Sequence, residues 1–205
     1  IPIYNDFRVT YINKDYFKKA GIERMPTTPD ELMQDAITIK EKGVCEYPLL
    51  VPFTATGATT TPWYLLTKAY GGELLSETNE PLFASKDSAG YKAMEFLIKG
   101  LKDYQVIDPA SIGWKGTDVV DNFKAGQGAI DIAGWAGNVS LYTNPKESKI
   151  VDSVQVIKVP GQNGKSRTYG LQEGLSVPAK SKNKEAAVEF IRWLNTPENV
   201  EKLFI

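Results

Sequence analysis

The chain has 205 residues, 42% of them hydrophobic, and its 24 Lys and Arg residues nearly balance 25 Asp and Glu residues, for a formal net charge of −1. This balance leaves no electrostatic footprint for nucleic-acid binding, and the absence of histidine excludes a Ser-His-Asp triad and any His-ligated metal site. The one cysteine, Cys45, is expected to be a small buried apolar residue. No cofactor or metal is expected, and no apolar run reaches the roughly 18 residues of a membrane span.

The first element in chain order is an extended segment over 1–13, because Val9, Tyr11 and Ile12 favour strands. A short helix over 16–20 follows, and Gly21 ends it.

The run YINKDYFKKAGI, residues 11–22, closely resembles a signature of family 1 extracellular solute-binding proteins, the substrate-capturing components of bacterial ABC importers. The resemblance implies that the preceding strand crosses between two lobes and borders the ligand. It places Asp6 where a polar residue contacts sugar in the maltodextrin-binding branch, and a carboxylate can accept two hydroxyl groups. The alternative for Asp6 is a turn residue after Asn5. Arg8 could pair with Asp6, donate to ligand hydroxyls, or be a solvated surface residue.

A capping box at 28–31, with proline at the first helical position, predicts a helix that extends to about Lys42. A short buried strand is predicted over 49–53, followed by a hydroxyl-rich loop over 54–61 and a helix opened by Thr61-Pro62. Together these make a pocket wall suited to an uncharged polyol or an anion. The resemblance suggests three ligand contacts here, and packing in the lobe core is the alternative for the tryptophan. These candidates are Thr60, Trp63 and Tyr64.

Residues 73–84 are turn-rich, and Ser85 is predicted to cap a long helix over 86–104. Its buried stripe is expected to comprise Gly90, Met94, Leu97, Leu101 and Tyr104. A loop over 110–116 follows, in which Trp114 could serve as a sugar platform.

The stretch NFKAGQGAIDIAGWAGNV, residues 122–139, predicts a helix end, a glycine stop, a short buried strand and then Trp135. Ligands of open α/β sheets bind beyond the carboxyl ends of strands, and a flat ring there can stack on the apolar face of a sugar. A core position is the alternative for Trp135. The stretch also resembles a block of the same family, whose tryptophan packs on the ligand in the sugar-binding branch; Tyr142, on a short helix, is expected near the cleft.

A strand is predicted over 154–159, a surface turn over 161–168 and a glycine-broken strand over 169–178. The resemblance implies that this last strand returns to the first lobe and lines the cleft. Where many members have Gly-Gly, this chain has Glu173-Gly174, so Gln172 and Glu173 are candidate contacts. An amphipathic helix over 182–194 ends the blocks that resemble the family, and a further helix begins near Pro197. The inward side of the helix over 182–194 is expected to comprise Ala187, Phe190, Ile191 and Leu194.

The ordered blocks imply an α/β, two-lobe fold of the periplasmic-binding-protein type. Residues 1–8 are expected to be a crossover strand from lobe 1, 9–168 to form lobe 2, and 169–205 to return to lobe 1. The chain resembles the middle of longer members, so we expect a fragment that lacks most of lobe 1, any signal sequence and any lipid anchor. The uncovered helix at 182–194 then predicts poor solubility of the fragment alone.

The leading functional hypothesis is a non-enzymatic component that captures an extracellular sugar or oligosaccharide and delivers it to an ABC permease, as a surface lipoprotein or in the periplasm. Trp135 would stack, and Asp6, Gln172 and Glu173 would form hydrogen bonds. One alternative is another solute, a polyamine or a metal. A second is a glycoside hydrolase that uses Asp6 and Glu173 as its carboxylate pair. A third is a sensory or adhesive ectodomain.

Overall fold

A computed structural model describes the backbone of residues 2–204 and the side chains of residues 5–202. The chain divides into two compact units: unit 1 comprises Ile1–Asp6 and Gly170–Ile205, and unit 2 comprises Phe7–Tyr169. None of the helices in the described part of the chain combines the length and the apolar composition of a membrane span.

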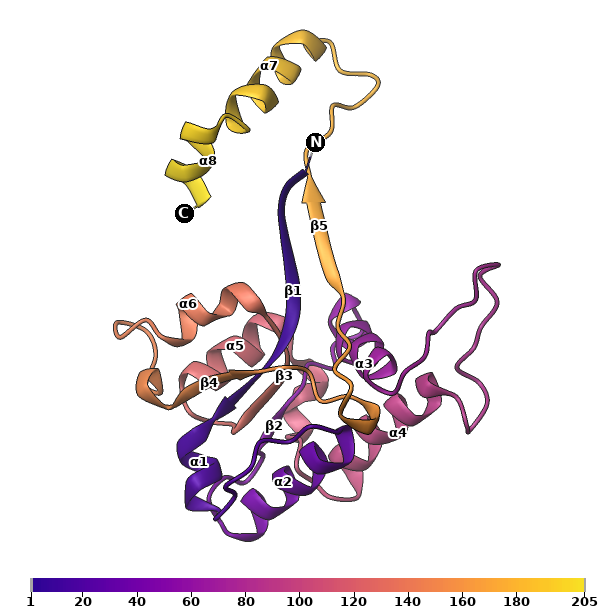
Figure 1. Cartoon of the computed structure of the whole chain (residues 1–205), viewed down its shortest axis with the longest axis vertical. Coiled ribbons are helices and arrows are strands. Elements are labelled where there is room, and N and C mark those ends of the chain that lie inside the picture. Colours follow the sequence, from indigo (N-terminus) through magenta and orange to yellow (C-terminus); the bar gives the residue numbers. More distant parts are fainter. Residues whose placement is uncertain (1, 205) are drawn as a thin grey trace. The chain divides into compact units, whose positions relative to one another are not determined.

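Unit 2 is built on a twisted sheet in the strand order β2-β3-β1-β4 (Figure 1). Strand β3 pairs in parallel with β2 and antiparallel with β1, and β1 also pairs antiparallel with β4. The strands are β1 (Pro2–Asn13), β2 (Leu49–Leu50), β3 (Ile130–Trp135) and β4 (Val154–Ile157). A parallel pair requires a crossover, and here α3, α4 and α5 lie between β2 and β3 in the chain. The fold is therefore mixed α/β, as the sequence predicts.

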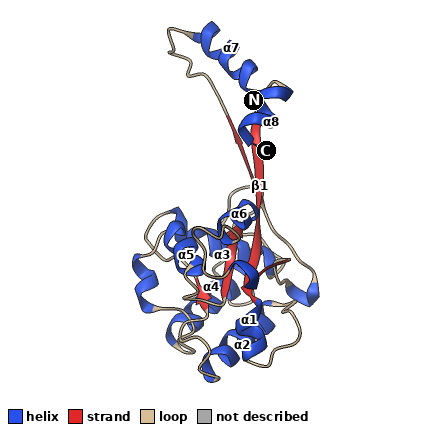
Figure 2. Ribbon diagram, turned by 90° about the vertical axis from the view of Figure 1, so that its left-hand side faces the viewer, coloured by secondary structure: helices blue, strands red, loops and turns tan. Residues whose placement is uncertain are grey.

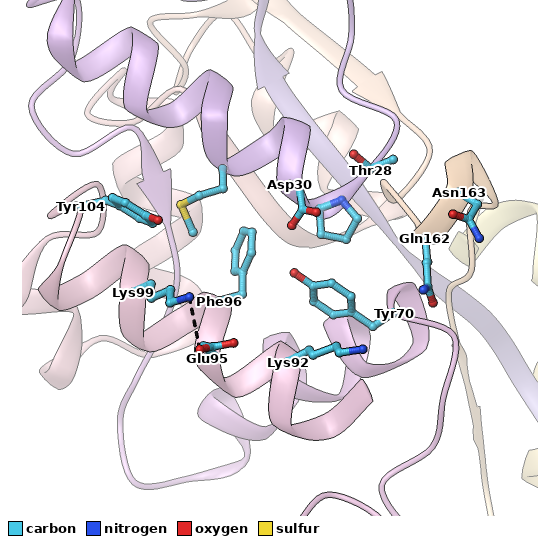
Figure 3. Close-up of a pocket in the computed structure, with 12 residues that line it drawn as sticks. Thr28, Asp30, Tyr70, Lys92, Glu95, Phe96, Lys99, Tyr104, Gln162 and Asn163 are labelled. Atoms are coloured by element: carbon cyan, nitrogen blue, oxygen red, sulfur yellow. Dashed lines mark ion pairs between the residues drawn. The ribbon is translucent and has the colours of Figure 1, made fainter. Parts of the chain in front are cut away.

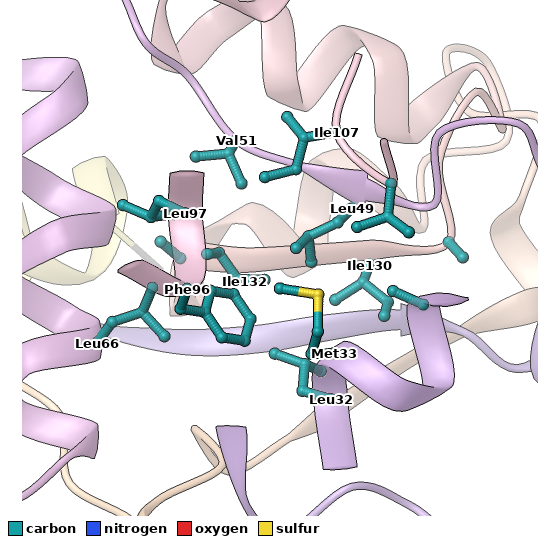
Figure 4. Close-up of a cluster of buried hydrophobic side chains, with 14 of the residues drawn as sticks. Leu32, Met33, Leu49, Val51, Leu66, Phe96, Leu97, Ile107, Ile130 and Ile132 are labelled. Atoms are coloured by element: carbon teal, nitrogen blue, oxygen red, sulfur yellow. The ribbon is translucent and has the colours of Figure 1, made fainter. Parts of the chain in front are cut away.

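Helices cover both faces of this sheet, as Figure 2 shows. The helices of unit 2 are α1 (Lys14–Lys19), α2 (Pro29–Glu41), α3 (Gly57–Ala69), α4 (Ala89–Lys102), α5 (Gly116–Lys124) and α6 (Val139–Tyr142). Alternation along the strands sends neighbouring side chains to opposite faces. Ile12 thus joins a cluster with residues of α2, α3 and α4, whereas Tyr11 joins one with residues of α5 and α6. Figure 4 shows the first cluster, with Leu32, Leu66 and Phe96 among its labelled members.

In unit 1, β5 (Gly170–Gly174) pairs with β1, and α7 (Lys184–Leu194) precedes α8 (Pro197–Phe204). The sequence assigns Phe190 and Ile191 to an apolar side of α7 that lobe 1 would cover, and the described chain leaves most of that side uncovered. Phe190 is 56% exposed and stacks on the equally exposed Trp193 with ring centroids 6.0 Å apart, whereas Ile191 is buried. The apolar face of α7 is thus largely uncovered within the described chain.

Two helix starts differ from the prediction because local side-chain caps decide them. Helix α3 begins at Gly57, where the side chain of Thr56 accepts from the N–H of Ala58, so that Pro62 lies inside the helix. Helix α4 is capped by Ser88 and not by Ser85. The buried stripe of α4 is shifted with it.

That stripe comprises Gly90, Ala93, Phe96, Leu97 and Gly100. Small residues bring α4 close to its neighbours: a Cβ on Gly100 would lie 2.8 Å from Ile107 Cδ1. Tyr104 lies beyond the helix and is exposed, and Met94 is only half-buried, contrary to the prediction.

Three smaller predictions are also corrected. The strand at 49–53 is reduced to β2, because Pro52 has no N–H to give to a ladder. In the capping box of α2, the 2.7 Å hydrogen bond to the Glu31 carboxylate comes from the N–H of Thr27, one residue before the capping Thr28. Cys45 is half-buried against the core, and not fully buried.

Candidate ligand-binding site

A cavity of about 660 Å³ lies in unit 2 beyond the carboxyl ends of β2 and β3. Its wall comes from Arg8 of β1, Pro52 after β2, β3 with the turn that follows, the N-terminal part of α3, one side of α5, and Leu141 of α6. Open α/β sheets bind ligands at this edge, because the strands end there and the helices that follow present unpaired backbone N–H groups.

Trp135 ends β3 and faces Arg8 of β1 in the antiparallel register. The two side chains are stacked: the Arg8 guanidinium carbon lies 3.2 Å from the centroid of the Trp135 ring, and Arg8 Nη1 donates to the carbonyl of Ala133 over 2.7 Å. A planar guanidinium on an aromatic face is a favourable cation–π arrangement. Both side chains are half-buried and line the cavity.

Hydrogen bonds from the Tyr11 hydroxyl fix the turn that carries Trp135. The carbonyls of Trp135 and Ala136 both lie 2.8 Å from the Tyr11 hydroxyl. Gly134 is required just before the tryptophan, because a Cβ there would approach Asp131 Oδ2 and Tyr11 Cδ2 to 2.6 Å. The position of the ring thus depends on contacts made by fully buried neighbours.

Asp131 is a buried acid near the start of β3 that also borders the cavity. It accepts from the Tyr142 hydroxyl over 2.7 Å and from the N–H of Ala133 over 3.3 Å. Burial raises the pKa of Asp131, while these two hydrogen bonds and the charge of Arg8 act to lower it. Burial and the neighbouring Asp131 also raise the pKa of Tyr142. Tyr142 is fully buried, so it supports the cavity wall from behind, whereas the sequence placed it near the cleft.

The N-terminal parts of two helices supply polar groups to the wall. Gly57, Ala58 and Thr61 come from α3, and Gly116 and Thr117 come from α5. The N–H groups of a first helical turn have no partner within the helix, so those that no cap occupies can donate to ligand oxygens. The N–H of Ala58 is already bonded to the side chain of Thr56. Lys115, Asn138, Asp121 and Lys124 are further polar lining residues, and Lys124 is paired with Asp121 and with Glu147.

Of the eight predicted site residues, Trp135 and Arg8 lie together at this cavity. Tyr64 packs on Tyr169 with ring centroids 4.9 Å apart, and Thr60 is exposed one residue before the lining Thr61. Neither Tyr64 nor Thr60 lines the cavity.

Trp63 donates from its indole N–H to the Gly90 carbonyl and meets Phe83 edge-on, which fits the packing role named above as its alternative.

The remaining three candidates belong to unit 1. Asp6 is half-buried on β1, and Gln172 and Glu173 are exposed on β5. Their roles as ligand contacts stay predictions.

Sequence reasoning missed several lining residues, namely Thr61, Lys115, Thr117, Asp131 and Asn138. One of them carried a signal: Asp131 is a lone acid in an otherwise apolar strand, and buried acids need partners. The others lie within a few residues of a helix start, and these positions are recognisable only once the helix starts are known.

A second cavity, of about 480 Å³, lies between α2, α4 and the end of α3 (Figure 3). Asp30, Tyr70, Lys92 and Gln162 line it, and Lys99 pairs with Glu95 over 3.2 Å at its edge. Burial raises the pKa of Tyr70, and the carboxylates of Asp30 and Glu95 raise it further. None of the predicted site residues lies here. Among the described residues, no group of three His, Cys, Asp or Glu side chains is placed to hold a metal ion.

The fold and the cavity beyond β2 and β3 define a lobe of the periplasmic-binding-protein type. The sequence model of the family described as "Bacterial extracellular solute-binding protein" matches residues 1–201, so the chain belongs to that family.

Three similar proteins illustrate the relationship. The chain is 27% identical to a probable amino-acid ABC transporter periplasmic-binding protein of Sinorhizobium fredii, over 99% of this chain and 45% of that protein. It is 28% identical to the mannitol-binding protein of Pseudomonas aeruginosa, over 94% of this chain and 44% of that protein. A solved ABC transporter solute-binding protein of Agrobacterium radiobacter, in complex with ribitol, matches with a TM-score of 0.86 and 23% identity, over 98% of this chain and 50% of that one. The chain thus spans less than half the length of these curated relatives.

Proposed function

We propose that this chain is part of an extracellular or periplasmic substrate-binding component of a bacterial ABC importer, and that the component captures a sugar or sugar alcohol and delivers it to the permease. The observation that carries the proposal is Trp135, a large flat ring in the wall of the unit 2 cavity at the carboxyl end of β3. Such a ring can cover the apolar C–H face of a sugar while the polar wall satisfies its hydroxyl groups.

Family membership supports this assignment, and so do the names of two similar proteins, one that binds mannitol and one in complex with ribitol. The amino-acid label on the Sinorhizobium relative leaves another solute class for the test to address. In the proposal Trp135 stacks on the ligand, and Arg8, Asp6, Gln172 and Glu173 form hydrogen bonds with it. The lobe boundaries expected from the sequence remain part of the proposal.

The proposal can be tested by a thermal-shift screen of the intact protein against sugars, sugar alcohols, amino acids, polyamines and divalent metals. A ligand that binds only the folded state stabilises it by about 2.7 kcal/mol at a concentration of a hundred times Kd. We expect a carbohydrate to raise the midpoint and to change the tryptophan fluorescence. Shifts with amino acids, polyamines or metals alone would refute the carbohydrate assignment.

Two variants make the screen specific for the cavity. Trp135→Ala is expected to weaken carbohydrate binding about tenfold or more, because a stacking contact of about 1.4 kcal/mol is lost. Trp114→Ala is the matched control, since this half-buried tryptophan does not line the cavity. Recovery of the bound sugar uncleaved after long incubation distinguishes capture from hydrolysis by Asp6 and Glu173.

A further inference from the structure

The unit 2 cavity offers a ligand one aromatic platform. Among the described residues that line it, Trp135 alone has an aromatic ring. The nearby tyrosines, Tyr64 and Tyr169, pack on each other and do not line the cavity. A ligand in this cavity therefore meets a single flat apolar surface.

One face of that platform is already covered. Arg8 lies flat on the Trp135 ring at 3.2 Å and is fixed there by its hydrogen bond to the Ala133 carbonyl and by the β1–β3 register. The guanidinium carbon also lies 6.0 Å from the Tyr169 ring. Because Arg8 occupies one face, a sugar can stack on the other face only.

The rest of the wall suits hydroxyl groups better than further sugar faces. Its polar part comes from Thr61, Thr117 and Asn138, from the backbone at the starts of α3 and α5, and from charged side chains that can also bond to hydroxyl groups. These charged residues are Arg8, Lys115, Asp121, Lys124 and Asp131. Its apolar part consists of proline and branched aliphatic side chains, which are narrower than an aromatic ring. These residues are Pro52, Val119, Val120 and Leu141.

We propose that this cavity selects a single monosaccharide or a short sugar alcohol and discriminates against longer oligosaccharides. The inference rests on the proposed function and narrows its ligand class. Each additional sugar ring of an oligosaccharide needs its own apolar surface to repay the cost of ordering it, and the wall provides no second platform. A short ligand can instead stack once on Trp135 and form hydrogen bonds between its hydroxyl groups and the polar wall. A ligand without these hydroxyl groups would leave the polar groups of the wall without partners.

The experiment is calorimetric titration of the intact protein with three homologous series: xylose to xylotriose, glucose to maltotriose, and the alditols ribitol and mannitol. We expect the tightest ligand to be a monosaccharide or an alditol. Addition of a second sugar unit to a monosaccharide that binds is expected to weaken binding at least tenfold. A disaccharide or trisaccharide that binds within tenfold of its monosaccharide, or more tightly, would overturn the inference while leaving the carbohydrate assignment intact. If no carbohydrate of any length binds, the proposed function fails, and the inference fails with it.

Variants connect the size preference to the platform. Trp135→Leu is expected to lower monosaccharide affinity at least tenfold, and the matched Trp114→Leu to change it less than twofold. Arg8→Ala uncovers the second face of the ring, so the ratio of monosaccharide to disaccharide affinity should fall at least threefold. This ratio is measured within one variant, so a partial loss of folded protein does not alter it. An unchanged ratio in Arg8→Ala would show that the arginine does not set ligand size.

Discussion

Asp35 provides a test of how burial in α2 sets the stability of unit 2. It is 3% exposed, its Oδ1 lies 3.5 Å from Arg24 Nη2, and its Oδ2 has no hydrogen-bond partner among the described residues. Burial raises the pKa of Asp35 from 3.8 to about 6; Arg24 partly opposes this rise and Glu31 adds to it. The perturbation is Asp35→Asn, which removes the charge and nearly preserves the shape.

The pKa shift gives both the sign and the size of the effect. A folded-state pKa above the unfolded value means that the folded state holds the proton more tightly, so stability is lost as the pH rises from about 4 to about 6 and stays low above that. A shift of about 2 pKa units corresponds to about 3 kcal/mol. The variant loses the ion pair with the exposed Arg24, which stabilises the folded state by about 0.5 kcal/mol. We therefore expect Asp35→Asn to be about 2 kcal/mol more stable than the native protein at pH 8 and nearly equal to it at pH 4.5.

The assay is urea unfolding of the intact protein, followed by far-ultraviolet circular dichroism at pH 4.5, 6 and 8. Asp152→Asn is the control, because this aspartate is exposed and its replacement should have little effect at any pH. Arg24→Gln should destabilise the protein more at pH 8 than at pH 4.5, since it removes the charge that opposes the rise in pKa. A gain for Asp35→Asn that is the same at pH 4.5 and pH 8, or a loss at pH 8, would refute the reasoning.

Two further predictions concern the support of the cavity. Gly134→Ala is expected to destabilise the protein by about 1–3 kcal/mol in urea unfolding, because the added Cβ would meet Asp131 Oδ2 and Tyr11 Cδ2 at 2.6 Å; an unchanged midpoint would contradict that close approach. Tyr142→Phe leaves Asp131 with one hydrogen bond fewer and is expected to cost about 1–3 kcal/mol. The loss in the free energy of unfolding should be larger at pH 8 than at pH 4.5, since the pKa of Asp131 rises further in the variant. A loss independent of pH would show that the Tyr142 hydroxyl does not affect the pKa of Asp131.

Much of the fold could be predicted from local patterns. The family match over residues 1–201 confirms the resemblance carried by the motif at 11–22 and the block around Trp135. Helix α2 begins after Thr28, as its capping residues predict. The predicted buried strand is β3, and it ends at Trp135. These features depend on backbone hydrogen bonds and caps within a few residues, which a short stretch of sequence determines. The observed starts of α3 and α4 differ from the predicted ones, because Thr56 and Ser88 cap these helices.

The cavity itself depends on contacts between residues far apart in the chain. Composition and motifs by themselves determined that this is an α/β member of a solute-binding family, with a tryptophan at a strand end. Only the tertiary structure places Arg8 on the face of Trp135, brings the first turns of α3 and α5 to the same edge, and buries Tyr142 against Asp131. The physical reason is that strand register and helix packing are set by the burial of both faces of the sheet, and this burial involves the whole of unit 2 at once.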